Sequence, residues 1–281
     1  MPRRSLIPLA AGCLLALLVT RSAQGQTYWH DERAKSAIRL DLIKPLLKGD
    51  GNQFLSGALV LSGSTRIGRT LRFEAELPIA RAGVDAGAGS SASATRLGNP
   101  YLGLTVHREG KPVALQFGVR LPTAGDPAAS IDDFANSVGI LADFDRFEAF
   151  SPKVLTARAA IEVRHVNPGG LLLGAKLGPS LFVDTRNGTS GDTQELFADY
   201  GLRVGYEGPA VLATVGFTGR AWITESNLNF GERTVHQLTG AVELRRGRVR
   251  PSGLLRVPLD QSFRDMTGVI VGLGVTLDFD R

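Results

Sequence analysis

The sequence predicts an all-β fold, a transmembrane antiparallel up-and-down β-barrel of about twelve strands. Three observations lead to this prediction. The N-terminus is typical of an export signal. Apolar and polar residues then alternate with a period of two through nearly all of the remaining chain. The connections between the alternating segments are short and long in turn, as in outer-membrane barrels.

The first element is the export signal. Arg3 and Arg4 precede an apolar run over residues 6–19, and small residues at Ala23 and Gly25 occupy the two positions that a signal peptidase reads. The run is shorter than the roughly 20 apolar residues that a spanning helix needs. A cleaved signal peptide therefore accounts for this segment better than a membrane anchor does.

The predicted organisation is a signal peptide at residues 1–25 followed by an outer-membrane barrel domain at residues 26–281. A lipoprotein signal ending at Cys13 is the alternative, but it would leave the apolar LLALLV on the mature side. Cys13 is the only cysteine in the sequence, so the mature chain is expected to lack disulfides. No later segment has 18 apolar residues without a charge, so we expect no transmembrane helix.

The strands follow from the alternation. In LRFEAELPIA, residues 71–80, Leu71, Phe73 and Ala75 face one side, while the intervening Arg72 and Glu74 face the other. Most of the alternating runs are near the ~10 residues with which a tilted strand crosses a membrane. The predicted strands are 36–43, 54–67, 70–80, 96–108, 113–121, 153–165, 171–184, 195–206, 210–223, 233–245, 249–259 and 267–279.

The connections between these strands fall into two classes. The short ones are 68–69, 109–112, 167–170, 208–209 and 246–248, and the long ones are 46–53, 81–95, 122–152, 185–194, 224–232 and 261–266. Short and long alternate without exception, which predicts tight periplasmic turns on one rim and longer outer loops on the other. Both termini are then expected on the periplasmic side.

A soluble all-β protein with a half-buried sheet shows the same alternation. The export signal, the absence of thiols and the rhythm of the connections favour the outer membrane of a Gram-negative bacterium instead. The expected partners are outer-membrane lipid, the barrel-assembly machinery and a small-molecule solute. The formal charge of +5 is spread along the chain, and this argues against nucleic-acid binding, which needs a clustered basic patch.

Residues 54–127 carry motifs of a known family. These are Leu77-Pro78-Ile79, Leu97-Gly98-Asn99, Leu102-Gly103-Leu104 and Leu121-Pro122-Thr123. With them the sequence resembles the outer-membrane β-barrel proteins of the phenol-degradation MetA-pathway family. The chain departs from that pattern at Asn99, where Asp is frequent, and at Ala124, which precedes Gly125. The resemblance implies a transporter-type barrel for hydrophobic or aromatic compounds.

The polar faces of the strands supply the candidate pore-lining residues. They are Arg72, Glu74, Glu76, Arg120, Arg158, Glu162, Arg164, Asp199, Arg203, Glu207, Arg220, Glu243, Arg245 and Arg256. An excess of arginine on the wall would favour anionic solutes. The alternative is that these residues pair across strands and brace the barrel. The nearly equal number of acidic residues favours pairing.

The longest predicted loop, 122–152, contains the one segment with helical spacing, residues 131–150. This segment is a candidate gate, and it either folds inward as a constriction, covers the mouth as a lid, or forms a helical turn on the rim. The candidate gate residues are Asp132, Asp133, Phe134, Leu141 and Phe144. Its acidic residues do not have the spacing of a standard calcium loop.

The sequence predicts a channel or transporter for passive passage of small solutes, not an enzyme, and no metal or cofactor. None of the four histidines lies in an H-x-S arrangement, and no G-x-S-x-G is present. Asn187 fits a glycosylation sequon but is expected to make a turn. Glycines on the inner face, Gly118, Gly201, Gly205, Gly272 and Gly274, are expected to leave space in the lumen. A non-conducting structural or surface-interaction barrel and a lipid-modifying enzyme are the alternatives.

Overall fold

The computed structural model describes residues 36–48, 54–87, 90–107, 110–186, 194–225, 229 and 231–279. The predicted signal peptide, with Cys13, lies outside the described residues. So does Asn187 of the sequon.

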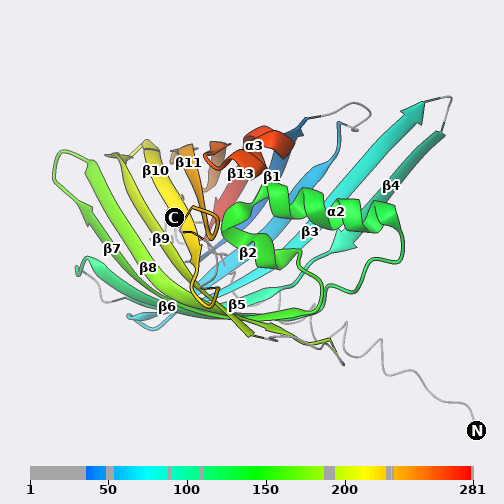
Figure 1. The fold of residues 1–281 in the computed structure, drawn as a ribbon. Coiled ribbons are helices and arrows are strands. Elements are labelled where there is room, and N and C mark those ends of the chain that lie inside the picture. Colours follow the sequence, from blue (N-terminus) through cyan, green and yellow to red (C-terminus); the bar gives the residue numbers. More distant parts are fainter. Residues whose placement is uncertain are drawn as a thin grey trace, which may run out of the picture.

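The strands form one closed antiparallel barrel (Figure 1). They are β1 (Ser36–Leu47), β2 (Gly57–Ile67), β3 (Leu71–Gly87), β4 (Ser90–Leu97), β5 (Tyr101–His107), β6 (Val113–Arg120), β7 (Val154–Val166), β8 (Leu171–Asp184), β9 (Gln194–Glu207), β10 (Val211–Trp222), β11 (Thr234–Leu244), β12 (Val249–Pro258) and β13 (Thr267–Asp278). Because β4 and β5 pair with successive parts of β3, these thirteen strands occupy twelve positions around the wall. The predicted fold class is confirmed.

The barrel has its apolar residues outside and its charged residues inside. Leu202 is 62% exposed and Ile161 is 48% exposed, whereas the neighbouring Arg203 and Glu162 are buried at 4% and 1%. This arrangement is the reverse of a soluble protein and is the one that a barrel surrounded by lipid requires. The alternation in sequence therefore assigned the two faces correctly.

One rim carries the short turns and the other the long connections. The short-turn rim holds the turns after β2, β7, β9 and β11, together with the start of β1 and the end of β13. Gly170 and Gly247 have φ of 88° and 80°, a conformation that glycine adopts without steric cost and that tight turns need. The opposite rim is called the long-loop rim below.

The predicted loop 81–95 is wrong. Here β3 continues to Gly87 and β4 returns from Ser90, so the segment is a hairpin that projects beyond the wall (Figure 1). Its small alanine and serine side chains suggest a loop from the sequence. In the structure two of the alanines let a helix pack closely, since Ala82 lies in an apolar cluster with Ala135 and Val138 of that helix and Ala94 packs against the cluster.

The predicted strand 96–108 is interrupted. β4 ends at Leu97 and β5 starts at Tyr101, and the residues between them bond to other parts of the chain. Gly98 N donates to Pro78 O at 2.9 Å, and Asn99 N donates to Ala149 O at 2.6 Å. The wall therefore contains a break at which the long 122–152 connection is attached.

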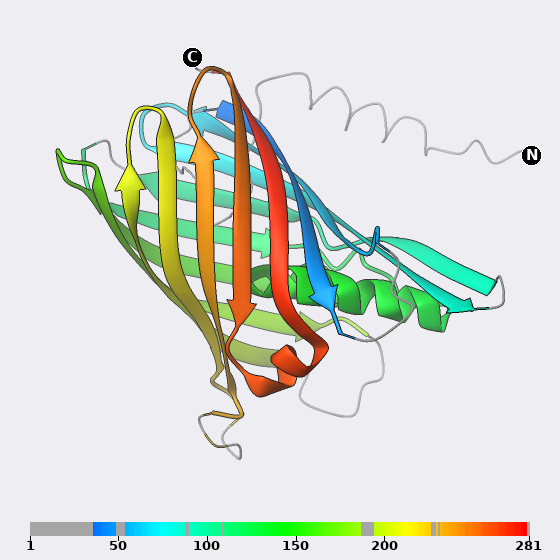
Figure 2. The ribbon, with the colours of Figure 1, turned by 90° about the horizontal axis from the view of Figure 1, so that it is seen from above.

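The 122–152 connection folds into the mouth of the barrel. It contains α2 (Ser130–Ala142) and the 3-10 helix η1 (Phe144–Ala149), and residues 130–150 are called the inserted segment below. Figure 2 shows α2 lying between the front and back walls. A second short helix, α3 (Gln261–Met266), lies in the predicted long connection 261–266.

Candidate functional site

The lumen is the candidate site, because the structure places all fourteen candidate pore-lining residues on the inner face. Each of them forms at least one ion pair with a residue of opposite charge. The charged side chains of the wall are therefore largely neutralised by one another. Their pairing separates into two networks, one at each rim.

The network near the long-loop rim is built around Glu148 of η1. Its carboxylate contacts arginines from three strands: Arg158 on β7 at 3.0 Å, Arg220 on β10 at 3.1 Å and Arg120 on β6 at 3.7 Å. The Glu148 side chain has no exposed surface. One carboxylate of the inserted segment thus connects three parts of the wall.

Asp143, between α2 and η1, makes the second set of contacts with the wall. Its Oδ1 lies 2.7 Å from Arg256 Nη1 on β12, and its Oδ2 accepts hydrogen bonds from Arg146. Arg146 in turn reaches Glu76 on β3, with 3.0 Å between Nη1 and Oε1. The inserted segment is therefore tied by charged groups to strands on several sides of the barrel.

Two buried carboxyl groups of the inserted segment, those of Asp143 and Glu148, are held ionised. Burial alone would raise the pKa of Glu148, but the surrounding Arg158, Arg220 and Arg120 lower that pKa below its ordinary value. Burial likewise opposes ionisation of Asp143, and Arg146 and Arg256 lower its pKa. The lowered pKa values mean that the ion pairs persist throughout the neutral range.

The network near the short-turn rim joins wall residues only. Arg245 lies 3.1 Å from Glu207 and 3.6 Å from Glu243, and Glu243 also contacts Arg39 at 3.5 Å and Arg250 at 3.8 Å. Arg164 pairs with Glu207, Arg250 with Asp278, and Arg39 with Asp41. The wall itself sets these pairs, because every partner stands on a strand or, for Arg245, directly after the end of β11.

Two smaller clusters complete the charged lining. Arg203 bonds Glu162 at 2.6 Å, and Gln116 donates to the same carboxylate at 2.9 Å. Arg72 pairs with Glu74 at 2.5 Å. The Arg203 and Gln116 contacts join neighbouring parts of the wall, whereas Arg72 and Glu74 both stand on β3. None of these contacts involves the inserted segment.

The five candidate gate residues are not grouped. Asp132 and Asp133 lie in the first turn of α2, where Asp132 accepts a hydrogen bond from Ala129 N at 3.2 Å. Phe134 packs on the cluster of Ala82, while Leu141 is buried and Phe144 contacts Phe263 with ring centroids 4.3 Å apart. The residues that make the buried ion pairs between the segment and the wall are Asp143, Arg146 and Glu148, and sequence reasoning did not name them as gate residues.

Asn99 anchors both ends of the 122–152 connection at the break in the wall. Its Nδ2 donates to Glu148 O at 3.0 Å and to Ser151 O at 2.7 Å, and its Oδ1 accepts from Ala124 N at 2.7 Å. An aspartate could not donate to the two carbonyl groups. These two donated hydrogen bonds explain why this chain has asparagine, and not aspartate, at position 99.

Gly118, Gly272 and Gly274 do not leave open space in the lumen, contrary to expectation. A Cβ on Gly118 would lie 2.0 Å from the hydroxyl of Tyr101, and one on Gly274 would lie 2.4 Å from Asp41 Oδ1. The space beside Gly272 is filled by Leu254. These glycines accommodate large neighbouring side chains, so their presence gives no argument for a pore.

An aromatic cluster covers the mouth beside η1. Phe147 of η1 contacts Phe182 and Phe197 with ring centroids 5.2 and 6.1 Å apart, and the Arg220 guanidinium lies 4.6 Å from the Phe147 ring. Phe197 stacks on Trp222 at 5.8 Å. The cluster holds η1 against the ends of β8, β9 and β10 above the charged layer.

Neither a metal site nor a membrane-spanning helix is found among the residues that the structure describes. Among them no group of three or more His, Cys, Asp or Glu side chains is arranged to hold a metal ion. No helix in the described ranges is long and apolar enough to span a membrane.

The closed fold, the apolar outer surface and the charged lumen define an outer-membrane-type β-barrel. Solved structures share this fold. The COG4313 outer membrane channel from Pseudomonas putida F1 aligns with a TM-score of 0.60 at 8% identity, over 90% of this chain and 98% of that one. LpxR from Salmonella typhimurium aligns with a TM-score of 0.52 at 11% identity, over 87% and 100%.

The translocator domain of the autotransporter NalP from Neisseria meningitidis also shares the fold, with a TM-score of 0.51 at 10% identity, over 97% of this chain and 95% of that one. No protein-family model and no curated protein matches the sequence. The comparisons therefore establish the barrel fold, and the resemblance of residues 54–127 to the phenol-degradation family stays a prediction.

Proposed function

We propose that this protein is an outer-membrane channel for passive passage of small solutes, and that the inserted segment controls access to its lumen. The observation that carries the proposal is the attachment of the segment to the wall. Glu148 contacts arginines of three strands, so one short element blocks the mouth while belonging to no strand. The proposal places the termini in the periplasm and the long-loop rim outside the cell.

The attachment is of a kind that can be released. Ion pairs between the segment and the wall lie inside the lumen, where water would hydrate both partners once the segment moved away. Displacing the segment would also expose the apolar clusters around Ala82 and Phe150, and it would leave the hydrogen bonds between strands intact.

Two other functions are set against this proposal. A non-conducting structural or surface-interaction barrel is favoured by the extensive pairing inside the lumen. A lipid-modifying enzyme is the other alternative. It would need reactive groups at the level of the lipid, whereas a passive channel needs none. The sequence arguments above favour hydrophobic, aromatic or anionic solutes. The next section proposes a different solute class from the lining of the lumen.

Purified protein in planar bilayers tests the proposal. The intact chain should give small conductance steps, and a variant lacking residues 131–150 should give larger ones because the mouth is no longer occupied. Circular dichroism and a gel shift on boiling would verify that the deletion variant still forms a barrel. Silence from both folded proteins would support the non-conducting barrel and refute the channel.

A further inference from the structure

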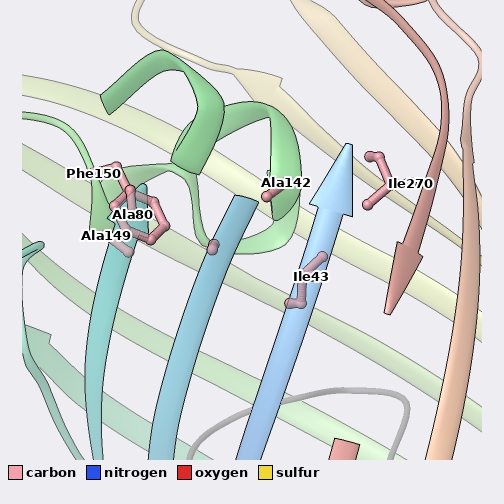
Figure 3. Close-up of a cluster of buried hydrophobic side chains, with 7 residues drawn as sticks. Ile43, Ala80, Ala142, Ala149, Phe150 and Ile270 are labelled. Carbon is pink, nitrogen blue, oxygen red and sulfur yellow. The ribbon is translucent and has the colours of Figure 1, made fainter. Parts of the chain in front are cut away.

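The inserted segment lies to one side of the lumen. The inner face of α2 packs on β2 to β4 through the cluster of Ala82, Ala135 and Val138. A second cluster joins Ala142 and Phe150 to wall residues such as Ile43 (Figure 3). Apolar contacts therefore close this side of the mouth against β1 to β4.

The opposite side of the lumen is closed less completely. A cavity of ≈ 50 Å³ lies between η1 and strands β7 to β11. Its lining includes Phe144 and Asp145 from the inserted segment, and Lys176, Thr218 and Gln237 from the wall. Gln237 Nε2 donates to Thr218 Oγ1 at 3.1 Å, so hydrogen-bonding groups face this space.

We propose that the permeation path of the channel, with the segment in place, runs through this cavity along β8 to β11, and that it carries small polar solutes and ions. The inference rests on the proposed channel function and adds the route and the solute class. A polar lining can replace the hydration of a polar solute during passage.

The size of the cavity sets the upper limit on the solute. One water molecule needs roughly 10–15 Å³ of such volume, and a cavity that binds benzene measures about 150 Å³. The ≈ 50 Å³ here holds a few water molecules and excludes an aromatic ring. Aromatic compounds would require displacement of the inserted segment.

The charges around the path are nearly balanced. Arg158 and Arg220 are both paired with Asp199 and with Glu148. Lys176 on one side and Asp145 on the other add one charge of each sign to the lining. The path should therefore discriminate only weakly between cations and anions.

Site-directed thiol modification tests the route. Cys13 is the only cysteine in the sequence and lies in the predicted signal peptide, so an introduced thiol would be unique in the mature protein. Thr218→Cys places a thiol at the cavity, and Lys176→Cys is the second variant there in case the first fails to fold. Ser62→Cys is the matched control on β2, at an inner-face position on the side covered by the segment.

With potassium chloride on both sides of a planar bilayer, a bulky methanethiosulfonate reagent should abolish most of the conductance of Thr218→Cys and Lys176→Cys. It should leave Ser62→Cys unchanged. Block of Ser62→Cys, or conductance of all three that survives labelling verified by mass spectrometry, would overturn the proposed route. Absence of conductance before labelling would instead refute the channel function itself.

Two further measurements on the unmodified protein test the solute class. The reversal potential in a potassium chloride gradient should lie close to zero. Proteoliposomes should swell in a small polyol and not in a disaccharide. Strong ion selectivity, or equal swelling in both solutes, would contradict the size and charge of this path.

Discussion

The two ends of the lumen use the same chemistry for different mechanical purposes. Near the short-turn rim, Glu243 and its arginines stand on wall strands or directly after one, so the sheet holds each pair in place. Near the long-loop rim, Glu148 and Asp143 belong to the inserted segment and only their arginine partners belong to the wall. Breaking a pair therefore weakens the barrel at one end and frees a segment at the other.

Because the two networks differ in where their central carboxylates are attached, the number of charged residues in the lumen does not indicate whether a gate is present. Buried ion pairs of similar length occur at both rims, for example 3.1 Å for Arg245 with Glu207 and 3.1 Å for Arg220 with Glu148. The pairs at the short-turn rim have both partners on the wall, whereas those that Glu148 makes at the long-loop rim have one partner on the inserted segment. The variants below separate the two roles.

The largest expected effect is on stability, from Glu243→Gln. Glu243 neutralises Arg39, Arg245 and Arg250 in a buried part of the wall. Removing one partner of a buried ion pair typically costs about 3–5 kcal/mol. Each of the three arginines keeps a second carboxylate, so we expect a loss toward the lower end of that range. Guanidinium titration of the barrel in lipid vesicles should show this loss in the free energy of unfolding, while the single-channel conductance stays unchanged. Unaltered stability, or an enlarged conductance, would remove the distinction between the two ends.

The second effect is on gating, from Glu148→Gln. The uncharged side chain leaves Arg120, Arg158 and Arg220 without their shared carboxylate, so the docked state of the inserted segment loses stability. We expect Glu148→Gln to open more often than the intact chain. Each opening should reach the large conductance expected of the variant that lacks residues 131–150. Glu207→Gln, at the short-turn rim, is the matched control and should not change the opening frequency. The comparison fails if both variants open equally often.

The third effect is the response to acid. In a released segment the carboxyl groups have ordinary pKa values, near 3.9 for Asp and 4.3 for Glu. Docking lowers the pKa of Asp143 and Glu148, so their contribution to docking is complete above those ordinary values and is lost as the pH falls below about 4. Conductance should be constant from neutral pH down to about 5 and should rise under stronger acid. A transition between pH 6 and 7 would implicate a different group.

The sequence predicted those features that depend on one strand and its two faces. Alternation alone identified the inner positions of Arg203 and Glu162 and the outer position of Leu202. The same alternation places Arg39 and Asp41, on the first predicted strand, on the inner face. They were not named as pore-lining candidates, although the pattern was sufficient to identify them. Local pattern is sufficient here because a side chain on a strand can face only the lumen or the lipid.

The features that depend on distant contacts were not predicted. Glu148 meets Arg220, which is 72 residues away, and no pattern within the loop identifies that partner. The hairpin formed by β3 and β4 was predicted as a loop because Ala82 and Ala94 acquire their role only when α2 packs on them. The glycine argument failed for the same reason, since Tyr101 fills the space beside Gly118 from a neighbouring strand.

The smallest expected effect comes from Asp132→Asn in the first turn of α2. Asp132 lies 3.8 Å from Arg96 on β4, and both side chains are partly exposed, at 20% and 18%. An ion pair that water can reach contributes about 0–1 kcal/mol, so the variant should change the opening frequency by less than a factor of about 5. The measurement is the same bilayer recording, with Glu148→Gln beside it as the reference for a large effect. If Asp132→Asn opened the channel as often as Glu148→Gln, the segment would be held at its exposed end, and the buried network at Glu148 would lose its assigned role.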